Sequence, residues 1–184
     1  MDLLKAVNSI LPKLGEHPVT SVEAKSPTLA VVLPQLDETR MSLLITGWWF
    51  NEYPVTLYPD SEGGITTPND MLSFVPDGRL HLAQRGKQFF NTADRSYKFP
   101  GPVRGVLVQD VPFEELPESV AQYVLYSALV VIYATDIGFE QVVQIWSGMA
   151  NAAQAAMEAE HMKQMKYTIK SSKRWTNLRR ALRN

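Results

Sequence analysis

The 184-residue chain contains no cysteine, which excludes disulfides, thiolate catalysis and cysteine metal sites. It also lacks a long hydrophobic run. The longest, residues 120–134, is interrupted by Gln122 and Ser127 and falls short of the roughly 20 residues that a membrane span needs. The first residues do not form the apolar stretch of a signal peptide. We therefore expect no membrane partner, and a protein made in the cytoplasm and used there or in a particle assembled there.

Acidic residues are missing from one end of the chain. None follows Glu160, although the chain holds 19 in all, and the segment beyond it carries eight of the 18 lysines and arginines. Residues 1–160 therefore have a formal charge of −9 and residues 161–184 a charge of +8. The net charge of −1 conceals this polarity. An end with charges of one sign indicates an anionic partner, or a surface shaped to receive it.

Proline is absent after Pro117, whereas eight of the twelve prolines fall between Pro54 and Pro117. Interior prolines remove a backbone donor and cost a helix about 3 kcal/mol each, so this region cannot be helical. The sequence predicts an α+β fold, mainly a bundle of four helices with a β-rich insertion between the second and the third. We expect residues 1–47 and 117–166 to form the helical body, residues 48–116 the insertion, and residues 167–184 an extended basic C-terminal arm.

Apolar residues recur at helical spacing on both sides of the predicted insertion. The first pattern covers residues 3–14, with an interruption at Pro12 and a stop at Gly15, and the second begins near Ser26 and ends before Gly47. The third helix, after the last proline, is apolar almost all round and should be the centre of the core. The fourth is expected to bury one face, made up of Val142, Val143, Trp146, Met149, Ala150, Ala153, Met157 and His161.

Turn chemistry and β-prone runs organise the middle of the chain. Strands are predicted at residues 53–58, 88–91 and 106–111. The segment Val75-Pro76-Asp77-Gly78 combines a preset dihedral, a turn-tolerant side chain and a glycine able to adopt positive φ. It lies between two apolar runs, residues 71–74 and 80–82, so we predict that these two runs pair as a β-hairpin.

The basic arm also has an apolar stripe. Trp175, Leu178 and Leu182 fall on one face of a short helix with arginines around them. So short a helix is marginal alone in water, and we expect a partner to order it. A solvated or disordered arm is the alternative. The residues predicted to dock are Lys170, Lys173, Arg174, Trp175, Leu178, Arg179, Arg180, Leu182 and Arg183.

Catalytic motifs are hard to find. The three histidines, His17, His81 and His161, stand outside any ligand-spaced motif, and there is no phosphate loop or nucleophile elbow. We expect no catalytic residue, cofactor or metal. Four carboxylates gather before the third helix, and Trp48-Trp49-Phe50 could form a sugar or base platform. Complementation of the helix dipole and burial of the aromatic residues are the favoured interpretations. The four carboxylates are Asp110, Glu114, Glu115 and Glu118.

Several stretches of the chain, over residues 6–165, resemble one family. They are residues 6–11 (AVNSIL), 14–16 (LGE), 18–23 (PVTSVE), 47–51 (GWWFN), 55–60 (VTLYPD) and 116–118 (LPE). The sequence is similar here to tail tubular protein A, the head-to-tail adaptor of short-tailed phages. The similarity decreases in the middle and is lowest after Met165.

The resemblance implies a structural protein of the virion tail. Such adaptors are helical bundles with a β-rich insertion, arranged as a ring of twelve below the portal protein. The ring continues the DNA channel, and its lower face meets the tail nozzle protein, tail tubular protein B, and the fibres near that junction. The family's C-terminal arm reaches along the portal. DNA would pass through without specific binding, because each phosphate contact adds affinity and slows passage.

Two other functions are alternatives. A nucleic-acid-binding protein could use the basic arm with Trp175 for base stacking, and its DNA affinity would fall steeply with salt. A tail-associated polysaccharide hydrolase could use two of the four clustered carboxylates with Trp48 or Trp49 as a sugar platform. Turnover that survives conversion of those carboxylates to amides would contradict the second alternative.

Overall fold

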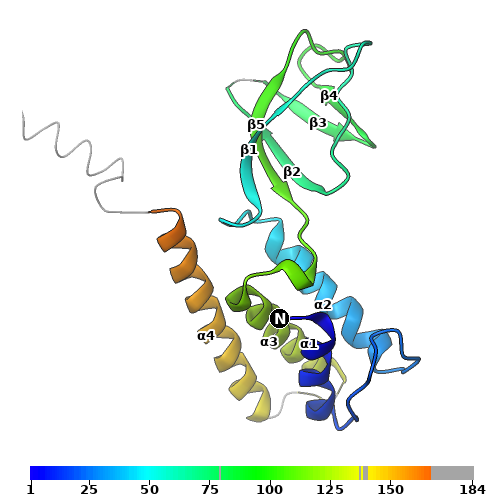
Figure 1. Ribbon diagram of the computed structural model, residues 1–184, viewed down its shortest axis with the longest axis vertical. Coiled ribbons are helices and arrows are strands. Elements are labelled where there is room, and N and C mark those ends of the chain that lie inside the picture. Colours follow the sequence, from blue (N-terminus) through cyan, green and yellow to red (C-terminus); the bar gives the residue numbers. More distant parts are fainter. Residues whose placement is uncertain (79, 137, 139–140, 167–184) are drawn as a thin grey trace, which may run out of the picture.

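The computed structural model describes residues 1–78, 80–136, 138 and 141–166, and it shows a mixed α+β fold (Figure 1). The helices gather at one end of the molecule and the strands at the other. The predicted mixed class is therefore confirmed. The helices are α1 (Leu3–Ile10), η1 (Leu11–Leu14), α2 (Leu29–Leu44), η2 (Phe113–Glu115), α3 (Glu118–Asp136) and α4 (Gln141–Gln164). The strands are β1 (Glu52–Leu57), β2 (Met71–Pro76), β3 (Leu82–Arg85), β4 (Gln88–Asn91) and β5 (Val103–Gln109).

The N-terminal helix follows its sequence signals closely. The Asp2 carboxylate accepts a hydrogen bond from the backbone N–H of Lys5 at 2.7 Å and so caps α1. The backbone then tightens into η1, which holds Pro12, and ends at Gly15 with φ of 80°. Glycine adopts this left-handed conformation without the penalty that a Cβ brings. The interruption at Pro12 and the stop at Gly15 are as predicted.

Helix α2 begins at Leu29, after the predicted start at Ser26, and Thr28 occupies its N-cap without a side-chain bond. Pro34 lies within the helix. The predicted apolar stripe is largely buried, but the helix also buries Arg40, which the hydrophobic pattern did not indicate.

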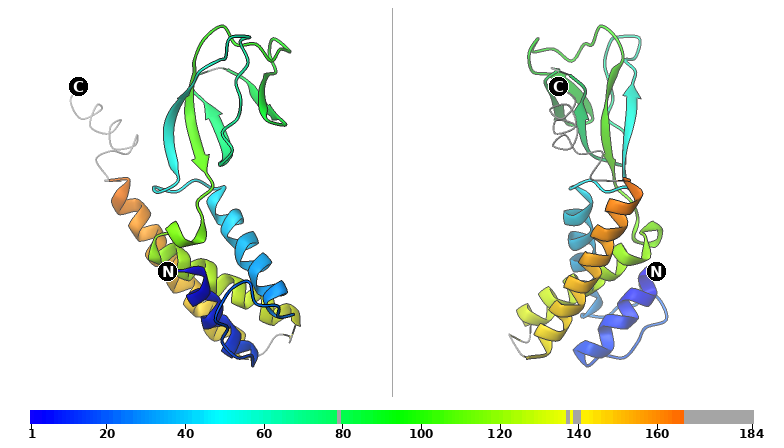
Figure 2. Two further views of the ribbon diagram at one scale, coloured as in Figure 1. Left: turned by 45° about the vertical axis from the view of Figure 1, so that its right-hand side comes forward. Right: turned by 90° about the vertical axis from the view of Figure 1, so that its left-hand side faces the viewer.

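Helix α3 is central among the helices. It packs against α1, α2 and α4. Its fully buried side chains lie on one side of the helix, and apolar residues of the other side are half-buried against the same core, so burial is less complete than the almost uniformly apolar sequence predicts. The half-buried residues are Tyr123, Tyr126, Val130 and Tyr133. Figure 2 shows α4 on one side of α3, with α1 and α2 on the other. Within the described ranges, no helix combines the length and the apolar content that crossing a membrane requires. The buried residues of α3 are Val120, Ala121, Val124, Leu125, Ala128, Leu129 and Ile132.

Helix α4 packs against α3 through a narrower stripe than the sequence predicted. Val143, Trp146, Ala150, Ala153 and Met157 are buried. Met149, expected on the same face, is 43% exposed. The reason is that α4 makes its main contacts with one helix, so only the residues that face α3 are buried.

The strands form two antiparallel sheets, ordered β1-β5-β2 and β3-β4. Strand β5 is central in the larger sheet, where Leu107 stands opposite Tyr53 on one side and Phe74 on the other. Between the sheets a second core forms around Ile65, Phe89, Phe99 and Val103. All of these strands lie between α2 and α3 in the sequence.

The predicted hairpin across residues 75–78 is wrong in its pairing. Gly78 does turn the chain with φ of 75°, but β2 pairs with β5, and β3 pairs with β4. The Asp77 N–H donates to the Arg104 carbonyl at 2.8 Å, which continues the contact with β5 beyond the end of β2. Local turn signals fixed the position of the bend, whereas distant apolar residues decided which strand became the neighbour.

Candidate functional site

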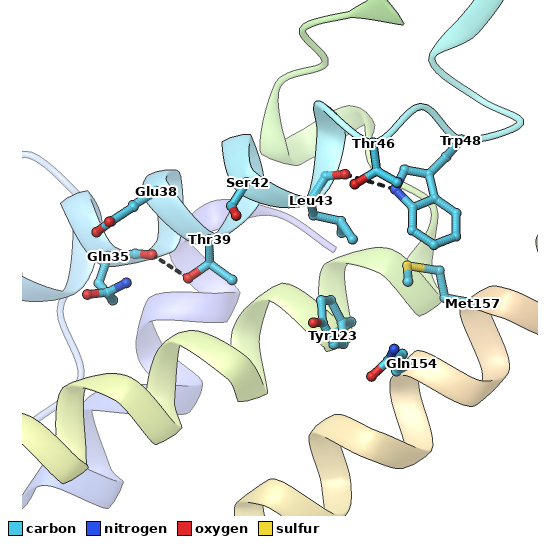
Figure 3. A pocket seen from close by; sticks show the side chains of 10 residues that line it. All are labelled: Gln35, Glu38, Thr39, Ser42, Leu43, Thr46, Trp48, Tyr123, Gln154 and Met157. Atoms are coloured by element: carbon cyan, nitrogen blue, oxygen red, sulfur yellow. Dashed lines mark hydrogen bonds between the residues drawn. The ribbon is translucent and has the colours of Figure 1, made fainter.

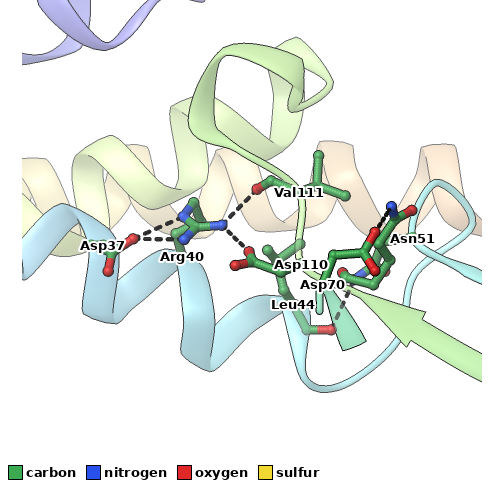
Figure 4. A network of polar contacts seen from close by, with 8 residues as sticks. Asp37, Arg40, Leu44, Asn51, Asp70, Asp110 and Val111 are labelled. Carbon is green, nitrogen blue, oxygen red and sulfur yellow. Dashed lines mark hydrogen bonds and ion pairs between the residues drawn. The ribbon is translucent and has the colours of Figure 1, made fainter. Parts of the chain in front are cut away.

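A polar network joins the helices to the larger sheet, and Arg40 on α2 is its charged centre (Figure 4). Its guanidinium donates to Asp37 at 2.7 Å, to the Val111 carbonyl at 2.6 Å and to the Asp110 carboxylate just after β5. Burial alone would lower the pKa of Arg40, but the hydrogen bonds that it donates to the carboxylates of Asp37 and Asp110 outweigh burial and raise the pKa. The cation is thereby held between two elements.

Asn51 makes the second link of the same junction. Its side chain is fully buried and satisfies three backbone groups: it accepts from the Trp48 N–H at 2.8 Å and donates to the carbonyls of Leu44 at 3.1 Å and Gln109 at 2.9 Å. One amide therefore ties the end of α2 to the end of β5. Because a buried amide that loses a partner costs free energy, this geometry favours a fixed attachment of the sheet.

Aromatic residues surround the junction on the α4 side. Trp48 donates its indole N–H to the Leu43 carbonyl at 2.9 Å, and its ring meets His161 edge-on at 5.3 Å between centroids. Trp49 lies 6.0 Å from His161 and 5.1 Å from Phe50. All three of Trp48, Trp49 and Phe50 are half-buried and pack against the main core. The prediction that this tripeptide is buried at the junction is therefore confirmed in part, because its three side chains are half-buried and not fully buried.

A groove of about 400 Å³ opens between α2 and α4, with Tyr123 of α3 at its floor and Trp48 at one end (Figure 3). Its polar lining consists mainly of hydroxyl and amide groups, with Glu38 as its carboxylate. A single carboxylate cannot act as an acid–base pair in glycoside hydrolysis, which needs two. The groove therefore offers hydrogen-bonding groups but not the pair of carboxylates that a hydrolase needs. Its polar residues are Gln35, Glu38, Thr39, Ser42, Thr46, Tyr123 and Gln154.

The four clustered carboxylates are divided among different roles. Asp110 pairs with Arg40, and Glu118 in the first turn of α3 lies 3.0 Å from the N-terminal ammonium of Met1. That ammonium and the Gln122 amide lower the pKa of Glu118. Glu114 and Glu115 belong to η2 and are exposed. Ion pairing and a place at the start of α3 account for Asp110 and Glu118 without a substrate.

The structure describes the three histidines but not the predicted docking residues. Residues 167–184, with every docking residue from Lys170 to Arg183, lie outside the described part of the chain. Of the histidines, His161 contacts the two tryptophans, whereas His17 and His81 are exposed. In the described ranges, no group of three or more histidine or acidic side chains is placed to hold a metal ion. The junction residues Arg40 and Asn51 were missed by sequence reasoning. A charged residue within an apolar stripe was the available signal for Arg40.

Fold and site together define a protein whose polar side chains connect its own elements and line an open groove. These contacts hold the larger sheet in a fixed position on the helices, as a structural role requires.

Comparison with known proteins agrees with a structural role. The family model for tail tubular proteins matches residues 4–167. A relative, the tail tubular protein A of Klebsiella phage KP34, is 30% identical over 163 residues, which cover 88% of this chain and 83% of that protein. The chain belongs to the tail tubular protein family. It is a structural component of a phage virion tail, in a family of structural proteins rather than enzymes.

Proposed function

We propose that this protein is the head-to-tail adaptor of its phage. Twelve copies form a ring that joins the portal protein to the tail nozzle and continues the channel through which DNA leaves the head. The observation that carries the proposal is the similarity over 88% of the chain to a protein named tail tubular protein A. The fixed junction at Arg40 and Asn51 supports it, because a subunit between two rings must hold its two ends at a constant separation.

In this proposal, residues 1–47 and 117–166 form the helical bundle of the ring. Residues 48–116 form the insertion that faces the nozzle protein, tail tubular protein B, and the fibres near it. The excess of acidic residues before position 161, −9 in formal charge, suits a channel wall that must not retain DNA. The basic arm docks on the portal, and twelve arms concentrate their charge at one rim, which multiplies weak individual contacts.

The first test is co-sedimentation with the portal ring of the same phage. We expect the full chain to bind near one copy per portal subunit and a chain ending at Met165 to lose binding. A full-length variant with Arg174, Arg179, Arg180 and Arg183 changed to glutamine is the matched control. It keeps the arm's length and removes half of the +8 charge. Equal binding of all three would show that the body docks and the arm does not.

The same protein preparation, tested for DNA binding, distinguishes the adaptor proposal from the nucleic-acid alternative. DNA retarded at low salt by the full chain, together with no portal binding, would overturn the adaptor proposal. Polysaccharide turnover that is lost when Glu114 and Glu115, exposed carboxylates of the cluster that do not belong to the junction, are changed to amides would support the hydrolase alternative instead.

A further inference from the structure

The outer face of α4 is apolar, uncharged and exposed. Ile145 is 58% exposed and Met149 43% exposed, and the alanines that follow them at three- and four-residue spacing are exposed too. A Cβ added at Gly148 would meet open space. No lysine, arginine, aspartate or glutamate occurs from residue 141 to residue 157. A solvent-facing helix ordinarily carries charges on this side, so the face has the composition of an interface. The exposed alanines are Ala152, Ala155, Ala156 and Ala159.

A groove of matching character lies on the other side of α3, along α2. It consists of two hollows, of about 380 and 370 Å³, which both include Val22 and Leu33. The first continues toward η2 past Leu36 and Phe113 to Arg40, and the second toward the start of α2 past Ala30 to the exposed Lys25, so the groove is mainly apolar with a cation near each end. The right-hand view of Figure 2 places α4 in front and α1 and α2 behind it. One chain therefore presents a convex apolar helix on one side and a concave apolar groove on the opposite side.

The charges at the ends of these two surfaces are complementary. The rim of the α2 groove near η2 carries the exposed carboxylates of Asp37 and Glu114. The C-terminal end of α4 carries Lys163, followed by Lys166, both exposed. The two carboxylates on the same turns, Glu158 and Glu160, accept hydrogen bonds from Gln154 and Ser119 of the same chain. An α4 seated in the groove with its C-terminal end toward η2 brings opposite charges together and leaves the uncharged face against apolar residues. This is recognition of a helix by a groove, with charge fixing the direction.

We propose that the outer face of α4 in one copy packs into the α2 groove of the next copy of this chain. Contacts between two different surfaces are heterologous, so they propagate from copy to copy and close into a ring when the rotation permits. The exposed apolar face from Ile145 to Ala159 covers about 21 Å of helix, or about four turns, that can lie along the groove. The inference supplies the lateral contact of the proposed ring and rests on that function for the number of copies.

The absence of native cysteine makes the test specific, because each introduced cysteine is the protein's sole thiol. Ala152→Cys marks the α4 face and Ala30→Cys the groove; both positions are exposed alanines. The two variants are mixed, free and bound to the portal ring, and treated with a short bismaleimide. We expect the yield of cross-linked dimer from Ala152→Cys with Ala30→Cys to be at least tenfold higher than the yield from Ala152→Cys with Ser61→Cys. Ser61 is an exposed control position in the β region. The double variant should give a ladder of higher oligomers.

Other outcomes identify other occupants and overturn the proposal. Efficient linking of Ala152→Cys to itself would show an α4–α4 contact. Linking of Leu178→Cys to Ala30→Cys in place of the expected pair would show that the basic arm fills the groove. Failure to link in portal-bound complexes would reject the lateral contact while the adaptor role stands. Linking of the free chain without portal binding would retain the contact and reject the adaptor role.

A second variant tests the same face by placing a charge on it. Ala152→Glu places a charge at an exposed position, so the thermal midpoint of the isolated chain should stay unchanged while linking between Ile145→Cys and Ala30→Cys falls at least tenfold. Asn151→Glu, one position round the helix toward its polar side, is the matched control and should retain linking. Equal linking in both backgrounds would contradict the proposed contact.

Discussion

Arg40 lies where α2 meets the end of β5, and its guanidinium donates to two carboxylates and one backbone carbonyl. Two of these acceptors, Asp110 and the Val111 carbonyl, belong to the segment that leads from the sheet back to the helices. Removal of the cation would leave the largely buried Val111 carbonyl without this donor. At the residue scale, the attachment of the sheet therefore depends on a charged side chain. Arg40 occupies a buried position of α2 at which the apolar pattern of the helix predicts a residue such as leucine.

Arg40→Met tests this dependence. We expect the free energy of unfolding to fall by about 2–3 kcal/mol, because acceptors that lose a buried cationic partner are left with an uncompensated desolvation cost. The urea midpoint measures the change. Asp37→Asn is the control: Asp37 is an exposed partner, so its loss should cost less than about 1 kcal/mol. Equal effects of the two changes would place the stabilisation in α2 itself rather than in the junction.

The pairing of Glu118 with the N-terminal ammonium gives a second prediction at this scale. The pKa of Glu118 is lowered in the folded chain, so its contribution to stability is present above the ordinary glutamate pKa, near 4.3, and is lost as the pH falls through the folded value. We expect Glu118→Gln to lower the urea midpoint slightly at pH 7 and to match the parent at pH 3. A difference that persists unchanged at pH 3 would assign the effect to the amide substitution itself.

At the scale of elements, the packing of β2 against β5 depends on the lack of a side chain at one position. A Cβ at Gly105 would overlap the Val75 carbonyl and the Phe74 ring. A bulge between Met71 and Ser73 shifts the register of the same strand against β5 by one residue. Close backbone approach and one bulge therefore set a pairing that joins residues about 30 positions apart.

Gly105→Ala is expected to destabilise the sheet by about 1–3 kcal/mol, because the Val75 backbone and the half-buried Phe74 ring must move to admit the methyl group. Gly101→Ala is the matched control, since a Cβ there meets nothing within 4 Å. Thermal unfolding gives the size of the effect, and limited proteolysis of the segment between β2 and β3 shows where it acts. A larger effect at position 101 than at position 105 would contradict this description of the sheet.

At the scale of the whole molecule, charge separates along the sequence, with −9 in residues 1–160 and +8 in residues 161–184. The proposed portal contact uses the positive end, whereas the proposed lateral contact buries mainly apolar surface and has opposite charges only at one end. The two contacts should therefore respond differently to ionic strength, because salt screens exposed charges and leaves apolar burial largely unaffected.

We expect portal binding by the full chain to weaken at least tenfold between 50 and 500 mM salt, whereas linking of Ala152→Cys to Ala30→Cys should change less than twofold. Sedimentation and gel densitometry measure the two effects. Lateral linking that falls as steeply as portal binding would show that charges, and not the α4 face, hold neighbouring copies together.

Much of the architecture was open to prediction from single segments. Capping, proline and glycine positions are local, so the break after α1, the start of α3 and the mixed class followed from them. The fourth helix was placed correctly, yet Met149 was assigned to its buried side because periodicity gives a face but not its width. The docking residues from Lys170 to Arg183 remain a prediction.

The sequence by itself determined where helices and strands form and where charge accumulates, because propensity, periodicity and composition act over a few neighbouring residues. Tertiary structure alone decided that β2 lies beside β5, that Arg40 and Asn51 join the sheet to α2, and that an uncharged helix face stands opposite an apolar groove. These features depend on contacts between residues distant in sequence, whose free energy is gained only when the chain has brought them together.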